Sequence, residues 1–200
     1  MTVTTPELTL RSLRPDWDRA RWEQLPDDGN RYEIIHGVLY MTTAPSAFHQ
    51  WIIRQVARSL FRQIDDLDIG TTLWSPIGVF MPGCDPIQPD LLVIRIADLG
   101  MIHDRRIHGI PALLVEVLSP SNPEQDLEVK RDVYAQAGVP EYWIIRPAER
   151  DVLVFSHPDI VLGIYTRVIP IPSTGELTSP TLPFRATVAD FFAGAPDTTL

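Results

Sequence analysis

The chain has 200 residues, of which 44% are hydrophobic and 22% are charged, and its formal net charge is -9. This composition is typical of a globular domain and excludes a disordered chain. The acidic balance argues against a protein that coats nucleic acid through bulk positive charge. No apolar run is long enough to span a membrane, no secretory signal is present, and the single cysteine, Cys84, excludes an internal disulfide. We therefore expect a cytoplasmic protein.

The basic residues are distributed unevenly between the two types. Sixteen of the seventeen are arginine, and the only lysine is Lys130. Arginine is a wide, planar and permanently charged group, whereas lysine is a compact point charge whose pKa can be tuned. Composition alone favours codon bias as the origin of this imbalance. Evidence that Lys130 has a function must therefore come from its position in the sequence.

The first part of the chain is predicted to hold an arm and a hairpin. Residues 1–25 lack clear periodicity and are interpreted as an arm with one short helix around 16–24. Two short strands are expected within 31–41, joined by a tight turn at His36 and Gly37.

The longest helical pattern covers residues 46–66, with Ser46 as a suitable N-cap. Three arginines recur along it at every fourth residue, namely Arg54, Arg58 and Arg62. This stripe and the basic loop 103–108 are the strongest local positive features, and either could contact phosphate groups. A solvated face is the commoner explanation for both. Tryptophans such as Trp74 are interpreted as core residues.

Strands and helices share the rest of the chain. A strand interrupted by Pro76 and Gly78 is expected within 71–81, and a helix over 123–137 is predicted to end at Gly138. Further strands are predicted at 91–96, 112–118, 141–146, 151–155 and 161–169, and a short terminal helix at 187–193. The helices are too few for a doubly wound parallel fold, so the pattern predicts an α/β domain with a mixed sheet.

Two carboxylates are candidates for a metal site. Asp90 begins the strand 91–96, and Glu116 lies near the end of the strand 112–118. If these strands are antiparallel neighbours that pair Asp90 with Glu116, the connection is centred on residue 103, close to the centre of the predicted loop 97–111. A divalent ion such as Mg²⁺ turns the repulsion between two such carboxylates into a binding site. Asp90 could equally be a turn residue, whereas Glu116 is a lone charge in an apolar run and needs a partner.

The helix that follows carries Asp126, Lys130 and Tyr134 on one face. Lys130 could reach back to Glu116, where a cation can hold a water nucleophile or neutralise developing charge. The alternative is an ordinary ion pair between Asp126 and Lys130 on a solvated helix face.

Four motifs in this region resemble the Uma-two family of restriction endonucleases, a branch of the PD-(D/E)XK nuclease superfamily. The motifs are PDLLVI at 89–94, LLVEVLSPSN at 113–122, the D-x-x-x-K-x-x-x-Y pattern of 126–134 and GVPEYWIIRP at 138–147. The resemblance covers the chain from about Tyr32 to Phe192. It implies a restriction-endonuclease-like fold, a mixed β-sheet core flanked by α-helices, over residues 26–193, with 194–200 as a tail.

The resemblance also implies a set of site residues. Asp90 and Glu116 would bind Mg²⁺ or Mn²⁺, and Glu33 would complete the catalytic set. The superfamily lysine should follow two residues after the second acid, but Leu118 stands there. The family pattern therefore implies that Lys130 takes that role.

Three further residues are supporting candidates. His49 matches a histidine that recurs in the family's first long helix, and Asp126 and Tyr134 flank Lys130 on its helix face. From the residues alone, His49 is better explained as a packed or capping side chain unless it faces the carboxylates. In the same way, Glu33 could be an outward-facing strand residue.

The implied function is a metal-dependent endonuclease that hydrolyses DNA phosphodiester bonds, with a homodimer as an expectation carried over from the superfamily. One alternative is a catalytically silent, nuclease-like module that binds nucleic acid or regulates a partner, which the acidic charge and the missing motif lysine favour. A weaker alternative is a metal-dependent hydrolase of small phosphate esters.

Overall fold

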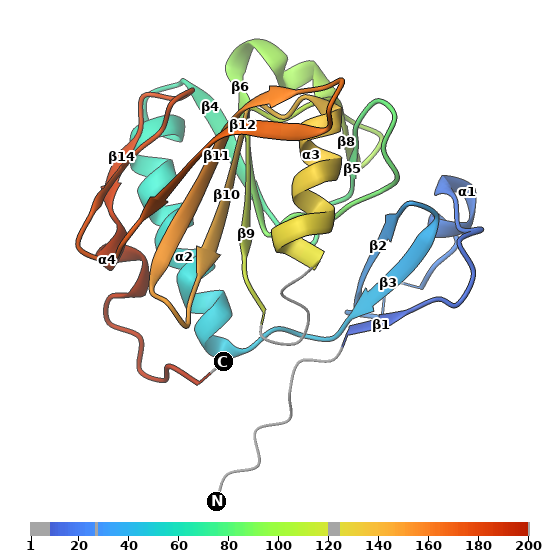
Figure 1. Ribbon diagram of the computed structural model, residues 1–200, viewed down its shortest axis with the longest axis horizontal. Helices are drawn as coiled ribbons and strands as arrows, with labels where there is room; N and C mark the ends of the chain where they lie inside the picture. Colours follow the sequence, from blue (N-terminus) through green and yellow to red (C-terminus); the bar gives the residue numbers. More distant parts are fainter. Residues whose placement is uncertain (1–8, 27, 120–124, 200) are drawn as a thin grey trace, which may run out of the picture.

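The computed structural model describes residues 9–26, 28–119 and 125–199, and the side chains of Thr9, Gln125 and Asp126 lie outside this description. A mixed six-stranded sheet with the strand order β12-β11-β10-β9-β6-β4 forms its centre (Figure 1). Strands β9 and β10 run parallel, and the other neighbours are antiparallel. The strands are β4 (Gly70–Trp74), β6 (Leu91–Arg95), β9 (Leu113–Val117), β10 (Glu141–Arg146), β11 (Asp151–Asp159) and β12 (Ile164–Ile171). The predicted α/β fold with a mixed sheet is confirmed.

One face of this sheet is covered by α2 (Ala47–Leu60) and α4 (Val188–Phe192). The predicted N-cap of α2 is confirmed, because the Ser46 hydroxyl accepts a hydrogen bond from the backbone N–H of His49. The helix continues into a π-helical segment, η1 (Phe61–Asp65), as the long helical pattern predicts. Its apolar side packs on strand residues that alternate along β6 and β9, which is the burial expected of one sheet face.

The opposite face is covered by a π-helical turn, η3 (Gln125–Lys130), and the helix α3 (Arg131–Ala137) that continues it. Gly138 ends α3 in the left-handed conformation at a φ of 81°, as predicted, and residues 123 and 124 of the expected helix lie outside the described residues. This helical segment connects two parallel neighbouring strands, β9 and β10, so it must cross the sheet above them. The crossover therefore places the segment that carries Lys130 over β9.

A smaller three-stranded sheet with the order β1-β3-β2 lies beside the large one (Figure 1). Its hairpin of β2 (Arg31–Ile35) and β3 (Val38–Thr42) turns at His36 and Gly37, as predicted, and both of these residues have positive φ. The short helix predicted in the arm is α1 (Arg19–Trp22), whereas β1 (Thr9–Arg11) was not predicted. The backbone N–H of Ile34 donates to the carbonyl of Pro86, which ties the hairpin to the main body.

Short elements complete the fold. The predicted interruption after β4 is confirmed, because residues 75–78 separate it from β5 (Val79–Phe80). The segment predicted as a loop over 97–111 contains most of a 3₁₀ helix, η2 (Ile96–Met101), and the hairpin of β7 (Ile102–His103) and β8 (Arg106–His108). A second short hairpin is formed by β13 (Glu176–Thr178) and β14 (Arg185–Thr187). None of the helices in the described ranges combines the length and hydropathy that crossing a membrane requires.

Candidate active site

The predicted register between the two acidic strands is confirmed. Strand β6 pairs antiparallel with β9 and matches Leu91 with Val115. One further step along each strand brings Asp90 opposite Glu116, and the backbone N–H of Asp90 lies 3.4 Å from Glu116 Oε2. Both side chains are buried, with exposed fractions of 2% and 0%. The two carboxylates therefore adjoin in the interior, as the position of the connecting loop predicts.

Asp90 is held by groups from three other elements. Its Oδ1 accepts a hydrogen bond from Arg31 Nη1 at 2.6 Å, and its Oδ2 accepts one from the backbone N–H of Val117 at 2.8 Å. His49 Nε2 lies 3.3 Å from Oδ2 and 3.0 Å from the carbonyl oxygen of Val117. Burial alone would raise the pKa of Asp90, but the charges of His49 and Arg31 and these hydrogen bonds hold it well below its usual range. Asp90 is therefore an anion at any pH at which the protein would work.

Glu116 is hydrogen-bonded to Lys130 and Tyr134, two of the residues predicted to share one helix face. Its Oε1 accepts hydrogen bonds from Lys130 Nζ at 2.9 Å and from the Tyr134 hydroxyl at 2.8 Å. Burial and the charge of Glu116 raise the pKa of Tyr134 well above its ordinary value, so this hydroxyl stays neutral and donates. Lys130 is 1% exposed, which rules out the solvated helix face considered as the alternative for it.

Glu33 enters the same cluster from the small sheet. Its Oε2 lies 3.0 Å from Lys130 Nζ, and its Oε1 accepts the backbone N–H of Gln88 at 2.8 Å. Lys130 therefore bridges two carboxylates that come from different sheets. The outward-facing alternative for Glu33 is wrong, because this side chain is buried.

Two supporting candidates have different outcomes. His49 does face the carboxylates, since its ring contacts Asp90 from the first turn of α2. The side chain of Asp126 lies outside the described residues, so its role stays a prediction.

Arg31 was not singled out from the sequence, although it contacts Asp90 and lies 3.9 Å from Glu33 Oε2. Residues 31 and 33 share one face of β2, because side chains alternate along a strand. The sequence did contain a signal for Arg31, namely a basic residue two positions before the predicted site residue Glu33.

A cavity of about 150 Å³ opens onto this cluster. Asp90, His49 and Arg31 line it, together with loop residues that precede α2 and follow β4. A small ion or water can therefore approach Asp90 from this side, past a guanidinium whose side chain is 21% exposed.

The donor set fits a hard divalent cation. Mg²⁺ prefers oxygen ligands, and Asp90 and Glu116 offer carboxylate oxygens from neighbouring strand positions. In this structure the negative charges of the three acids are balanced mainly by Arg31 and Lys130. A metal ion bound through Asp90 Oδ1 would therefore have to replace the Arg31 guanidinium that now donates to this oxygen.

The fold and this buried cluster define the class of protein, namely an α/β protein of the restriction-endonuclease-like type. The model of the Uma2 family, described as "Putative restriction endonuclease", matches residues 19–189, and the chain belongs to this family. The chain is also similar to a crystal structure from Anabaena variabilis described as a "putative nuclease belonging to DUF820". That match has a TM-score of 0.73 and 16% identity, and covers 87% of this chain and 96% of the other. No curated protein matches the chain.

Proposed function

We propose that the protein is a metal-dependent endonuclease that hydrolyses phosphodiester bonds of DNA. The observation that carries this proposal is the convergence of Glu33, Asp90, Glu116 and Lys130 in one buried cluster beside a cavity. Family membership supports a nucleic-acid substrate. Activity as a homodimer remains a prediction.

Each residue has a role that its contacts support. Asp90 and Glu116 would hold Mg²⁺ or Mn²⁺, which supplies an acidified water and stabilises charge on the phosphate. Lys130, which is hydrogen-bonded to Glu116, would stabilise the negative charge that develops during attack on phosphorus. Glu33 either adds a ligand or accepts the proton of the attacking water.

The surface of α2 supports a path for the substrate. A second cavity of about 480 Å³ is lined by the three arginines at i, i+4 and i+8, namely Arg54, Arg58 and Arg62, and by Phe61 and Trp74. All three arginines are exposed, and none of the ion pairs found in the described part of the chain includes them. Gln50 lines this cavity and the one above Asp90, so the two adjoin. The prediction of a core position is wrong for Trp74, which is 52% exposed and can stack on a base.

DNA binding without turnover tests this path. Fluorescence anisotropy with Ca²⁺ in place of Mg²⁺ should show that Arg58→Ala weakens binding several-fold and lowers the salt slope by about one phosphate contact. Arg167→Ala, an exposed arginine on the edge strand β12, is the matched control and should bind as wild type does. Equal losses in both variants would mean that only net charge matters, and the path would be wrong.

Plasmid nicking tests the reaction. Wild type should nick a supercoiled plasmid with Mg²⁺ and not with chelator, whereas Asp90→Asn and Lys130→Ala should be inactive. Glu149→Gln, which removes an exposed carboxylate elsewhere, should keep wild-type activity. Equal cleavage by all four proteins would identify a contaminating nuclease and refute the proposal.

The charge balance of the cluster favours a second candidate, a nuclease-like module without turnover. Arg31 and Lys130 already compensate the carboxylates without a metal ion. Calorimetric titration with Mg²⁺ and Mn²⁺ separates the two candidates. Binding that is lost in Asp90→Asn supports the endonuclease, and the absence of binding to wild type supports the silent module.

A further inference from the structure

Two histidines lie on one face of the short β7–β8 hairpin, outside the acidic cluster. His103 pairs with Arg106 across this antiparallel ladder, and His108 lies two residues beyond Arg106. Side chains at such diagonal positions point to the same face and are within reach of each other. Their rings stack with centroids 4.0 Å apart and planes 9° apart.

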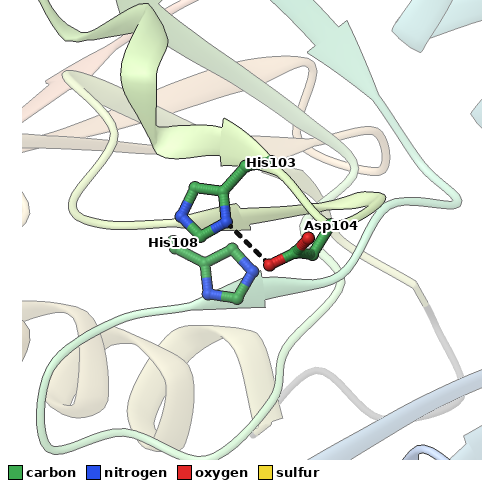
Figure 2. Close-up of side chains that lie close together, drawn as sticks. All are labelled: His103, Asp104 and His108. Carbon is green, nitrogen blue, oxygen red and sulfur yellow. Dashed lines mark hydrogen bonds and ion pairs between the residues drawn. The ribbon is translucent and has the colours of Figure 1, made fainter.

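Asp104 at the turn adds a carboxylate to this pair. Its Oδ2 lies 3.1 Å from His103 Nδ1, and Figure 2 shows the three side chains gathered on one side of the hairpin. One ligand atom from each of the three residues lies within 4.8 Å of the other two. Asp104 and Arg105 both adopt positive φ at this turn although neither is glycine. The turn is therefore held in a conformation that costs backbone energy and that directs Asp104 toward the histidines.

One nitrogen of this group lacks a partner. His108 Nε2 is buried and makes no hydrogen bond in the described structure, although its ring packs between Phe80 and His103. A buried polar atom without a partner is unusual and requires an explanation. A metal ion coordinated by the lone pair of this nitrogen supplies such an explanation.

Two imidazoles and one carboxylate match the ligand preferences of Zn²⁺ and similar first-row ions, whereas Mg²⁺ prefers oxygen ligands. Ligand atoms around a tetrahedral Zn²⁺ lie roughly 3.3 Å apart, because each is about 2.0–2.1 Å from the ion. The ligand atoms already lie within 4.8 Å of one another, and the side chains of His103 and Asp104 are 51% and 85% exposed, which leaves them room to move closer. Three protein ligands leave a fourth position for water or another ligand.

We propose that His103, Asp104 and His108 form a second metal site, which binds Zn²⁺ or a related divalent transition ion and is separate from the acidic cluster. The hairpin between the ligands carries Arg105 and Arg106. Both arginines line a cavity of about 410 Å³ together with Gln88, whose backbone N–H binds Glu33. A metal ion at the turn therefore fixes two positive side chains at the rim of a cavity next to the acidic cluster.

Calorimetric titration of the full chain with Zn²⁺, in an excess of Mg²⁺, tests this site. Mg²⁺ occupies oxygen-ligand sites and leaves the histidine site available. Wild type should bind Zn²⁺ at this site, and His103→Gln should weaken that binding by at least about 10-fold. Asp104→Asn should weaken it as well. His157→Asn, which removes an exposed histidine on β11, should bind as wild type does.

Co²⁺ provides an independent readout. Wild type should give the visible absorption bands of a tetrahedral Co²⁺ complex, and His103→Gln should lose them. Because the two altered side chains are exposed, the thermal unfolding of the metal-free variants should match that of wild type. Zn²⁺ affinity that is equal in wild type, His103→Gln and Asp104→Asn would overturn the proposal. Displacement of the Zn²⁺ by Mg²⁺ would also overturn it, because it would place the ion on the acidic cluster.

Discussion

Two buried glutamates on neighbouring strands show how differently one residue type can be used in this molecule. Glu116 on β9 and Glu141 on β10 both have an exposed fraction of 0%. Glu116 accepts hydrogen bonds from Lys130 and Tyr134, and the cluster to which it belongs opens to a cavity at Asp90. Burial alone therefore does not distinguish the carboxylate of the proposed site from the other one.

Glu141 is surrounded by neutral donors instead. The Ser179 hydroxyl, the Thr181 hydroxyl and backbone N–H, and the indole N–H of Trp143 all donate to its carboxylate. In the part of the chain that the structure describes, no basic side chain forms an ion pair with it. These bonds fix the start of β10 to the segment that follows β13. The two carboxylates therefore differ in the charge of their partners and in access to a cavity, and we propose that this difference separates a site carboxylate from a structural one.

Removal of the charge of Lys130 should give the largest effect on stability, and it tests the difference between the two glutamates most directly. Lys130→Met keeps an unbranched side chain one atom shorter but leaves Glu33 and Glu116 without the ammonium group between them. We expect the free energy of unfolding at neutral pH to fall by about 3–5 kcal/mol, as for other buried ion pairs that lose one partner. Urea denaturation measures this loss, and Mg²⁺ should restore part of it.

A control and a conservative variant sharpen this prediction. Ser179→Ala, which removes a neutral donor of Glu141, should cost only about 1 kcal/mol. Lys130→Arg should be inactive in plasmid nicking, because a planar guanidinium does not fit the buried site between two carboxylates. Full activity of Lys130→Arg would mean that the single lysine of this chain reflects only codon bias.

Neutralisation of each glutamate in turn should separate activity from stability. Glu116→Gln should reduce the rate of Mg²⁺-dependent nicking by at least about 100-fold, because it removes a proposed metal ligand and the partner of Lys130. Glu141→Gln should retain the wild-type rate within about a factor of three. Rate measurements at saturating DNA decide between the two roles. A similar loss in both variants would show that the rate depends on the packing of the sheet and not on the cluster.

Removal of one neutral hydrogen-bond donor from each glutamate gives a matched pair of variants. The expected loss of stability is smaller than for Lys130→Met. Tyr134→Phe removes a hydrogen bond to Glu116 and should lower the free energy of unfolding by about 1.5 kcal/mol, together with a several-fold loss of activity. Trp143→Phe removes a donor of Glu141 and should affect stability alone. Denaturation and nicking assays on the same preparations test this pair. An unchanged rate in Tyr134→Phe would show that the hydroxyl does not set the position of Glu116.

Much of the fold could be predicted because its signals are local. Apolar runs mark β6 and β9, the centre of the loop between them indicates the register, and Gly138 ends α3. The hairpin of β7 and β8 was not predicted, since its strands are short and its turn at Asp104 and Arg105 lacks glycine. Strand β1 was also missed, because three residues in an irregular arm carry no period.

The candidate site was only partly accessible from sequence. The pairing of Asp90 with Glu116 follows from strand register, and the contact of Lys130 with Glu116 follows from a helix that returns over the strand. The contact between Glu33 and Lys130 joins two sheets, and no local spacing encodes it, so only the family resemblance indicated it. The ion pair of Arg31 with Asp90 was missed for the same reason.

The pH dependence of stability should give the smallest effect, at most about 1.4 kcal/mol per pH unit for one proton, and it should have opposite signs at Asp90 and Glu141. The pKa of Asp90 is lowered in the folded protein, so its contribution is present above about pH 4 and is lost as the pH falls. Burial raises the pKa of Glu141, despite the hydrogen bonds from Ser179 and Thr181. Its contribution is therefore complete below about pH 4.5 and declines as the pH rises through the folded value.

Urea denaturation across about pH 3 to 8 measures both contributions as differences from wild type. The stability gap between wild type and Asp90→Asn should shrink toward acid, because the unfolded chain takes up a proton at Asp90 while Arg31 and His49 keep the folded carboxylate ionised. The gap between wild type and Glu141→Gln should shift against wild type as the pH rises, because the variant has no charge to bury. Slopes of the same sign would show that Glu141 has a cationic partner in solution, and the contrast between the two buried glutamates would then fail.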